Sequence, residues 1–384
     1  MDAFFASVEQ LDNSQLIGKP TVVTSHINSP TIIAASYEAK RLGYQVGMRY
    51  VANNGVYRCA ARPERYLNVS TRIMQALIEL CPEIEIFSVD EAFMDFTSYQ
   101  KIYKDIDQLV VSIQSTLIDT IDLPFSIGIG TNRTIAKLAS SENKPKGVCI
   151  IQPGHEEKFV YNKPIQSLCG IGKNITQFLN KQGVFLCQDM KKIPISFLSD
   201  KYGQNGRHIW RMAHGIDERP IIRSKDNRAY PKQMSNSKVV PPQDQKQLEK
   251  IRLYLHFICW RITQRMRAKQ LFTKEFTVIV YGYHQAYKIS YIHPYPTHSY
   301  TTLKMVYTAL LKKIKWPNQI RKVIVNTGYI FQTQQKDLFD EEVDTSEHTV
   351  DQINSRFGAN TIQTAAHLES NLKIYVIPFK GENI

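Results

Sequence analysis

The sequence predicts a multidomain protein of the α/β (α+β) class, in which helices and strands alternate along most of the chain. Its 384 residues exceed the usual size of a single domain. Up to residue 151, the order strand–helix–strand–strand–helix–strand is typical of a ferredoxin-type split βαβ sheet, with residues 11–60 as an insertion. Residues 152–222 have a helical pattern, and residues 229–333 return to a mixture of both elements.

Each expected element has a local pattern. The first ten residues are expected to be a strand end that enters a helix. Runs of β-branched and apolar residues predict strands at 18–24, 30–36, 124–130, 274–281 and 321–331, and a strand pair within 84–96. Helical spacing and stop signals predict helices at 36–43, 64–80, 101–119, 245–268 and 300–315. The acidic stretch 340–349 is expected to be a linker.

The composition excludes several classes of protein. With 43% hydrophobic and 22% charged residues, the chain is not globally disordered. No apolar run approaches the roughly 18 residues of a transmembrane helix, and the first residues, MDAFFASVEQ, lack the basic region of a signal peptide. The six cysteines occur singly, which argues against a disulfide framework or a zinc site. We expect a soluble protein of the cytoplasm.

Positive charge is concentrated in one part of the chain. The formal net charge is +13, yet residues 1–222 are nearly neutral, with 24 basic and 22 acidic residues. Residues 223–333 hold 20 basic and 4 acidic residues, whereas residues 334–384 hold 4 basic and 9 acidic residues. Such a local excess favours a polyanion as partner, because each Lys or Arg beside a phosphate releases counterions. Residues 229–333 are therefore predicted to bind nucleic acid, and the tyrosines interleaved there are what a half-exposed sheet would contain.

Asp90 and Glu91 form an acidic pair between the two expected strands of 84–96. At a hairpin tip, both carboxylates can project toward one site. Oxygen ligands of this kind suit Mg²⁺, which often shares its shell with substrate phosphates. Two such ions are the usual machinery of phosphoryl transfer. An ordinary acidic turn is the alternative, and the pair alone does not exclude it.

Other residues point to a triphosphate. Lys144 lies in a loop, NKPKG, where it can contact phosphate as a point charge. Tyr37 and Lys40, three residues apart in SYEAKR, share one helix face. Phe4 and Phe5 lie at an expected helix start, where backbone N–H groups can hold phosphate. Core packing is the alternative for both phenylalanines, and it is preferred for Phe4.

Residues 168–184, LCGIGKNITQFLNKQGV, have the pattern of a helix-hairpin-helix. Gly170 and Gly172 would form the turn and present backbone N–H groups to DNA phosphates, a contact that does not depend on base sequence. A simple connection between helices is the alternative. The neighbouring cation of Lys173 favours the DNA-binding interpretation.

Together these motifs resemble the Y-family translesion DNA polymerases of the UmuC/DinB (ImpB-MucB-SamB) type. MDAFFASVEQ, SYEAKRLGYQVGM, FSVDEAFMDF, SIGIGTNRTIAKLASSENKPKG and LCGIGK occur in the family's order and spacing. The resemblance covers essentially residues 1–330 and implies a right-hand polymerase. Its parts would be a ferredoxin-like palm, small fingers, a helix-hairpin-helix thumb and an α/β little finger. The palm would be residues 1–10 with 61–151, the fingers 11–60, the thumb 152–222 and the little finger 229–333.

The resemblance also implies roles for the acidic and aromatic residues. Asp90 would bridge two Mg²⁺ ions, and Glu91 would ligate the ion nearer the primer 3′ end. Phe5 looks like the steric gate that excludes a ribose 2′-OH. The substrates would be dNTPs and damaged primer–template DNA.

By the same resemblance, Tyr37, Lys40 and Lys144 look like contacts to the incoming triphosphate. The family more often has arginine where Lys40 stands. A lysine loses the bidentate phosphate contact and keeps only a point charge.

The acidic tail, residues 334–384, contains a second family motif. Gln335, Asp337, Leu338 and Phe339 belong to QKDLF, which is similar to the peptide by which bacterial polymerases dock on the sliding clamp. Leu338 and Phe339 would fill an apolar pocket while Gln335 forms orienting hydrogen bonds. Accessory mutagenesis subunits are a further expected class of partner.

One departure from the family concerns the first strand. The family has two aspartates there, and Asp2 aligns with the second, so the first metal-binding aspartate would fall just before Met1. Three interpretations stay open. Either the start of the chain is misassigned and the missing aspartate is encoded upstream, or Asp2 substitutes as a metal ligand, or the chain is a catalytically impaired relative.

The leading hypothesis is an error-prone, template-directed DNA polymerase that acts in the response to DNA damage, including the SOS response, as a mutator. A non-catalytic partner that binds DNA and the clamp is the alternative from a different class. A helix-hairpin-helix nuclease would explain the Gly170–Gly172 turn but not NKPKG. The sequence does not separate DinB-like from UmuC-like subtypes, nor does it define lesion specificity.

Overall fold

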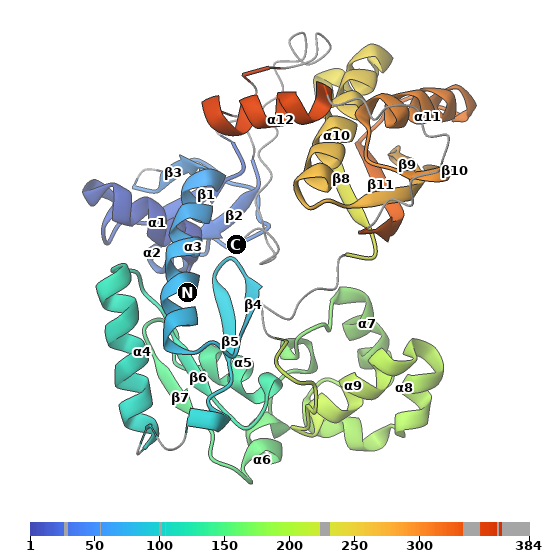
Figure 1. Cartoon of the computed structure of the whole chain (residues 1–384). Helices are drawn as coiled ribbons and strands as arrows, with labels where there is room; N and C mark the ends of the chain where they lie inside the picture. The colour runs from blue at the N-terminus through green and yellow to red at the C-terminus, as the bar shows by residue number, and fades with distance from the viewer. Residues whose placement is uncertain are drawn as a thin grey trace. The chain divides into compact units, whose positions relative to one another are not determined.

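The computed structural model describes residues 1–26, 30–53, 55–99, 102–103, 105–222, 231–332, 346–358 and 361–362. The described residues divide into two compact units. Unit 1 is described over residues 1–222 and unit 2 from residue 231 onward (Figure 1). Within the described residues, no helix is long and apolar enough to cross a membrane.

The segment expected as fingers contains a small three-stranded sheet. Its order is β2-β1-β3, from strands β1 (Thr21–Thr24), β2 (Ile32–Ala35) and β3 (Tyr57–Ala60). Helix α1 (Phe4–Asp12) packs against β1 and β2, and the short helix α2 (Tyr37–Arg41) follows β2. The Ser36 hydroxyl caps α2 by accepting a hydrogen bond from the Ala39 N–H, as expected for Ser at an N-cap.

Within residues 61–151 of the expected palm, the described residues form three α-helices and two strand pairs. Antiparallel β4 (Ile84–Ser88) and β5 (Glu91–Met94) form one pair, and parallel β6 (Ile127–Ile129) and β7 (Val148–Ile150) form the other. Helices α3 (Pro63–Leu80) and α4 (Ile106–Thr120) share the apolar core with them, and α5 (Arg133–Glu142) packs on β6 and β7. Gly128 allows this packing, because a Cβ there would lie 2.1 Å from the Ala136 carbonyl oxygen.

The expected ferredoxin-type sheet is divided at its first strand. Met1 and Asp2 lie between the two strand pairs, since the Met1 nitrogen donates to the Asp90 carbonyl at 2.6 Å and the Asp2 N–H donates to the Pro124 carbonyl at 2.8 Å. Two backbone hydrogen bonds are too few for a ladder. The described palm residues therefore form two strand pairs bridged by a dipeptide instead of one continuous sheet.

Residues 152–222 fold as the expected helical domain. Its α-helices are α6 (Glu156–Tyr161), α7 (Lys173–Lys181), α8 (Ile195–Tyr202) and α9 (Gln204–Ala213), with 3₁₀ turns at Ile165–Ser167 and Cys187–Lys192. The first arm of the predicted helix-hairpin-helix is only the 3₁₀ turn Ile165–Ser167, while α7 is the second. Helix α5 ties this domain to the palm through the Thr134 hydroxyl, which donates to Asp217 at 2.8 Å.

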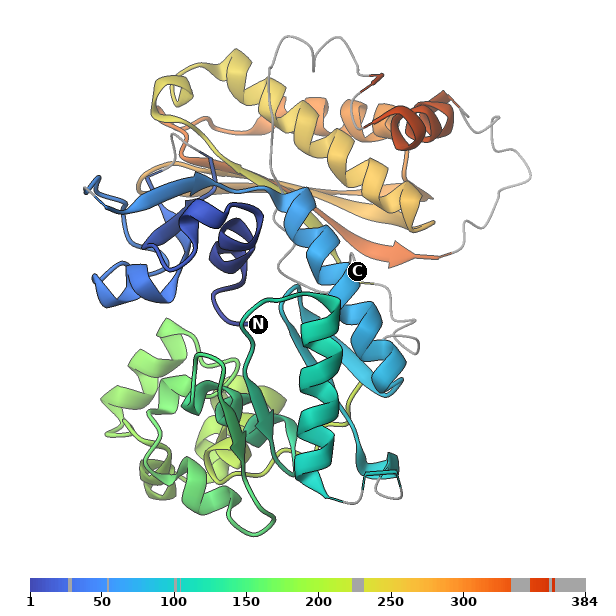
Figure 2. The same cartoon turned by 90° about the vertical axis from the view of Figure 1, so that its left-hand side faces the viewer.

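Unit 2 is a four-stranded antiparallel sheet with two helices on one face (Figure 2). The strand order is β10-β9-β11-β8, from β8 (Met234–Val239), β9 (Phe272–Tyr281), β10 (Ala286–Thr297) and β11 (Lys322–Phe331). Helices α10 (Leu248–Ala268) and α11 (Tyr300–Lys313) bury alternate strand residues such as Val278 and Val325. The opposite face is left without a covering helix among the described elements, so β10 is largely exposed.

The expectation of a linker at 340–349 is wrong in part. Helix α12 (Ser346–Phe357) begins inside that stretch, while residues 340–345 lie outside the described residues. Arg267 of α10 is almost fully buried and pairs with Glu347 and, at 2.6 Å, with Asp351. Glu347 also accepts a hydrogen bond from the Tyr300 N–H at 2.9 Å. Glu347 thus caps α11 and neutralises the buried Arg267. The acidic composition of the segment does not reveal this role, because both partners are distant in sequence.

We predict that Arg267→Met destabilises unit 2, because it leaves the Glu347 carboxylate buried without its cation. Removal of one partner of a buried ion pair costs about 3–5 kcal/mol. Amide hydrogen exchange in α12 should accelerate accordingly. Arg252→Met is the control, since Arg252 pairs with Glu249 on the surface, where ion pairs contribute about 0–1 kcal/mol. Equal effects of both substitutions would contradict the prediction.

Candidate active site

The tip of the β4–β5 hairpin presents Asp90 and Glu91. Strand pairing ends at Ser88 and Glu91, so the turn between them releases both acidic side chains from the ladder. The Ser88 hydroxyl donates to Asp90 Oδ1 at 2.7 Å, and the Lys137 ammonium lies 2.7 Å from Glu91 Oε2. Glu91 is 42% exposed, so its carboxylate remains accessible to a ligand.

Asp2 lies beside this tip but is fully buried. Its Oδ2 accepts hydrogen bonds from the Ser126 hydroxyl at 2.7 Å and from the Lys146 N–H at 2.9 Å. Its Oδ1 lies 3.3 Å from Lys144 Nζ, an ion pair without the alignment of a hydrogen bond. Burial by itself would raise the pKa of Asp2, but the Lys146 N–H, the Ser126 hydroxyl and the Lys144 ammonium outweigh it and hold the pKa below its usual value.

Tyr37 and Lys40 join Lys144 around Asp2. Lys40 Nζ lies 4.2 Å from the centre of the Tyr37 ring, a cation–π contact on one face of α2. Burial and the nearby positive charge of Lys144 lower the pKa of Lys40, and burial together with the charge of Asp2 raises the pKa of Tyr37. Residues from two segments more than 100 positions apart therefore form one positively charged cluster.

Phe4 and Phe5 are both buried, at 3% and 7% exposure. The Phe5 ring stacks on Tyr66 of α3 with the ring centres 4.4 Å apart, and the Tyr66 hydroxyl donates to Glu9 at 2.6 Å. The preference for core packing of Phe4 agrees with its burial. Phe5 is also part of the palm core, so any contact of Phe5 with a sugar would come from a side chain fixed by stacking.

The carboxylate oxygens at this site can bind a divalent cation only if oxygens of the substrate complete the coordination shell of the cation. Within the described residues, no three acidic, His or Cys side chains gather closely enough to enclose a metal. Asp90 and Glu91 supply adjacent, partly exposed oxygens, and Asp2 Oδ1 is a buried oxygen without a hydrogen-bond donor. Such oxygens suit Mg²⁺ held by one or two carboxylates, waters and phosphates, and they do not form a closed cage.

Helix α5 contributes two residues that sequence reasoning missed. Arg133 pairs with Glu85 of β4 at 2.6 Å and lies over the Phe93 ring, and Lys137, one helical turn later, pairs with Glu91. The spacing of four residues in RTIAK places both cations on one face. That spacing could have indicated a charged face, but the strand that the face contacts is not visible in the sequence.

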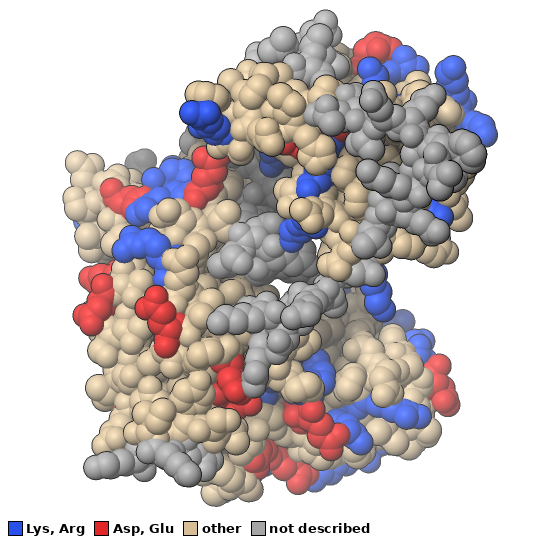
Figure 3. All heavy atoms as spheres, in the orientation of Figure 1, with Lys and Arg blue, Asp and Glu red and all other residues tan. Residues whose placement is uncertain are grey.

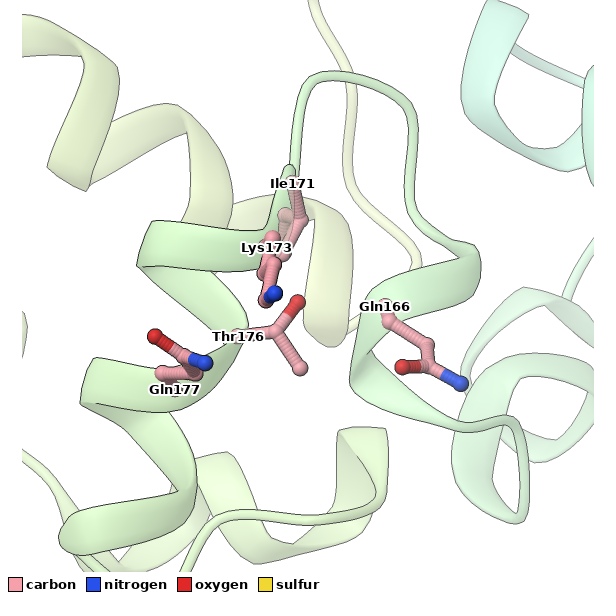
Figure 4. A pocket seen from close by; sticks show the side chains of 5 residues that line it. All are labelled: Gln166, Ile171, Lys173, Thr176 and Gln177. Carbon is pink, nitrogen blue, oxygen red and sulfur yellow. The ribbon is translucent and has the colours of Figure 1, made fainter. Parts of the chain in front are cut away.

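The predicted helix-hairpin-helix residues lie in a different core from the acidic pair. Gly170 has a φ of 92°, which favours glycine, and Gly172 is the N-cap of α7. Lys173, Thr176 and Gln177 of α7, with Ile171 beside Lys173, face Gln166 across an open pocket of about 500 Å³ (Figure 4). This N-terminal end of a helix, with the Lys173 ammonium and the Gln177 amide, has the chemistry of a phosphate contact.

Residues 231–332 of unit 2 hold 17 basic and 3 acidic residues, so they carry most of the charge excess of residues 223–333. On the face shown in Figure 3, Lys and Arg are more frequent than Asp and Glu over unit 2, whereas both signs are mixed over unit 1. The predicted clamp-binding residues Gln335, Asp337, Leu338 and Phe339 lie outside the described residues. Their role stays a prediction.

We predict that Asp2→Asn lowers the free energy of unfolding by about 1–3 kcal/mol at neutral pH, because charged hydrogen bonds are lost. The folded-state pKa lies below the ordinary value of 3.8. The stability that Asp2 contributes is therefore present above that value and disappears as the pH falls through the folded-state pKa. Urea unfolding at a series of pH values should show the two proteins converging in acid. Asn at the exposed Asp200 is the control, and a difference independent of pH would refute the assignment.

Comparison with known proteins identifies relatives of both units. Residues 1–141 match the impB/mucB/samB family, and residues 231–338 match the impB/mucB/samB family C-terminal domain. The chain is 30% identical over 275 residues to DNA polymerase IV of Desulfatibacillum aliphaticivorans, covering 70% of this chain and 68% of that protein. It is 34% identical over 225 residues to DNA polymerase IV 3 of Mesorhizobium japonicum, covering 58% of this chain and 62% of that protein.

A solved structure has the same fold. A Y-family DNA polymerase chimera of Dbh and Dpo4 superposes with a TM-score of 0.72 at 23% identity, covering 86% of this chain and 98% of the chimera. The chain thus spans about two thirds of the curated relatives and nearly all of the solved structure. The matched segments, the acidic hairpin and the fold agree, and the chain belongs to the impB/mucB/samB family of Y-family translesion DNA polymerases.

Proposed function

We propose that this chain adds deoxynucleotides to a primer 3′ end on damaged template DNA, with Asp90 and Glu91 as the metal-binding carboxylates of the active site. The observation that supports this most is the convergence of four segments. The acidic hairpin tip, the start of the chain at Asp2, helix α2 with Lys40, and the loop with Lys144 all meet within unit 1. Carboxylates beside a lysine cluster suit a metal-bound triphosphate.

In this proposal, Asp90 and Glu91 would hold two Mg²⁺ ions together with the substrate phosphates. The bound ions would neutralise the triphosphate and lower the pKa of the primer hydroxyl. Lys40, Lys144 and the Tyr37 hydroxyl would bind the β- and γ-phosphates and align the α-phosphate for in-line attack. Catalysis would come from positioning and electrostatics, without a protein nucleophile.

Asp2 would act mainly through the loop that it anchors. Its Oδ2 accepts one hydrogen bond from the backbone N–H of Lys146 and one from the Ser126 hydroxyl, and its second oxygen faces Lys144. A buried carboxylate that fixes a lysine pre-organises the phosphate site before the nucleotide arrives. Ligation of a metal by Asp2 Oδ1 would require the Lys144 ammonium to move onto the phosphates.

DNA would be held by the other parts of the chain. Unit 2, with its basic excess and open sheet face, would bind the duplex, and the Gly170–Lys173 turn would contact the backbone of one strand. We further propose that residues 335–339 bind the sliding clamp, that accessory subunits assist, and that the protein acts in the cytoplasm during the SOS response.

We predict that Glu91→Ala and Asp90→Ala each reduce single-nucleotide primer extension by at least about 100-fold, because they remove oxygens that hold and orient the reacting groups. DNA binding, measured by fluorescence anisotropy, should be unchanged. Glu79→Ala is the matched control, since Glu79 is exposed on α3 in the same domain. Extension that survives in Glu91→Ala would overturn the site assignment.

We predict that Phe5→Ala raises the ratio of ribonucleotide to deoxynucleotide incorporation by about tenfold or more, because the stacked ring no longer limits the space beside the sugar. Both kcat/KM values should be measured on one primer–template. Phe4→Ala provides the control, since it also removes a buried ring from the same core. If both variants change sugar discrimination equally, the effect is a loosened core and Phe5 is not the gate.

A further inference from the structure

We infer that Lys137 is a built-in counterion of Glu91, which holds this carboxylate in position and limits its affinity for divalent cations until a nucleotide is bound. This inference rests on the proposed function, because it takes Glu91 as a metal ligand. Lys137 Nζ lies 2.7 Å from Glu91 Oε2, the distance of a direct charged hydrogen bond. The two residues are 46 positions apart, so the fold and not local sequence brings them together.

Several contacts fix the lysine on the carboxylate. Its ammonium lies 4.7 Å from the centre of the Phe87 ring of β4, which confines it to the side of the hairpin. One turn earlier, the Arg133–Glu85 pair binds the same helix face to the same hairpin. The close contact of α5 with Gly128 fixes the distance between helix and strands. Lys137 therefore reaches Glu91 from a rigid support.

Carboxylates and amino groups gather around the site, and the buried amino group of Met1 is among them. Three carboxylates, from Asp2, Asp90 and Glu91, are accompanied by three lysines, Lys40, Lys137 and Lys144. Lys40 and Lys144 are placed to meet a triphosphate. Lys137 instead contacts Glu91, the carboxylate that the proposed function gives to a metal ion.

The consequence is a competition at Glu91. A divalent cation near Glu91 would be repelled by the ammonium, since both lie within a few ångströms of one carboxylate. A triphosphate that arrives with its own cation adds negative charge and offsets this repulsion. Lys137 would thereby make tight metal binding depend on the nucleotide, and it would keep Glu91 ordered before that event.

The test measures binding of Mn²⁺ alone to the full chain, by electron paramagnetic resonance titration without nucleotide or DNA. Lys137→Met should bind Mn²⁺ about three- to tenfold more tightly than the unmodified chain, because the competing charge is gone. Lys137→Arg, which keeps the charge, should stay within about twofold. Lys158→Met removes a charge from the exposed helix α6 and should have no effect.

Unchanged or weaker Mn²⁺ binding in Lys137→Met would overturn the inference, as would equal tightening in Lys158→Met. A merely structural role predicts weaker binding, because Glu91 would lose its support. Thermal unfolding checks that each variant is folded, and Lys137→Gln serves in the same test if Lys137→Met does not fold. Glu91→Ala separates the two proposals. If it leaves Mn²⁺ binding intact, the proposed site fails, whereas loss of binding there with no change in Lys137→Met refutes only the counterion.

Discussion

The buried carboxylate of Asp2 is the contact on which the rest of the site depends. It ties the start of the chain to Ser126, the residue before strand β6, and to the loop that contains Lys144 and Lys146. Because the adjacent Met1 nitrogen bonds to the Asp90 carbonyl, the same dipeptide also locates the acidic hairpin. Charged hydrogen bonds in a dry environment are strong and directional, so a small number of them can position several loops.

Much of the architecture could be predicted from local patterns. Helical spacing located α3, α10 and α11, and the two apolar runs around Asp90 located the β4–β5 hairpin. The missed elements have weaker patterns. Strand β3 has no buried residue, β10 is mostly exposed, and β8 contains Ser, Asn and Lys, so none shows the clear apolar alternation that marks a half-buried strand.

The candidate site was predictable as a set of residues but not as a set of contacts. Motif order pointed to Asp90, Glu91, Tyr37, Lys40 and Lys144, and the structure brings their segments together. The partners of these residues come from tertiary packing. Lys137 meets Glu91 only because Gly128 lets α5 approach β6, and Asp2 meets Lys146 across 144 positions of chain. Sequence spacing carries no information about such pairs unless the register of helix on strand is known.

Side-chain ion pairs and chain connectivity both attach α12 to unit 2. Strand β11 ends at Phe331 and α12 begins at Ser346, and both belong to unit 2. Helix α12 is therefore attached to unit 2 twice, through the chain and through the pairs of Arg267 with Glu347 and Asp351, so loss of these pairs would loosen α12 without detaching it.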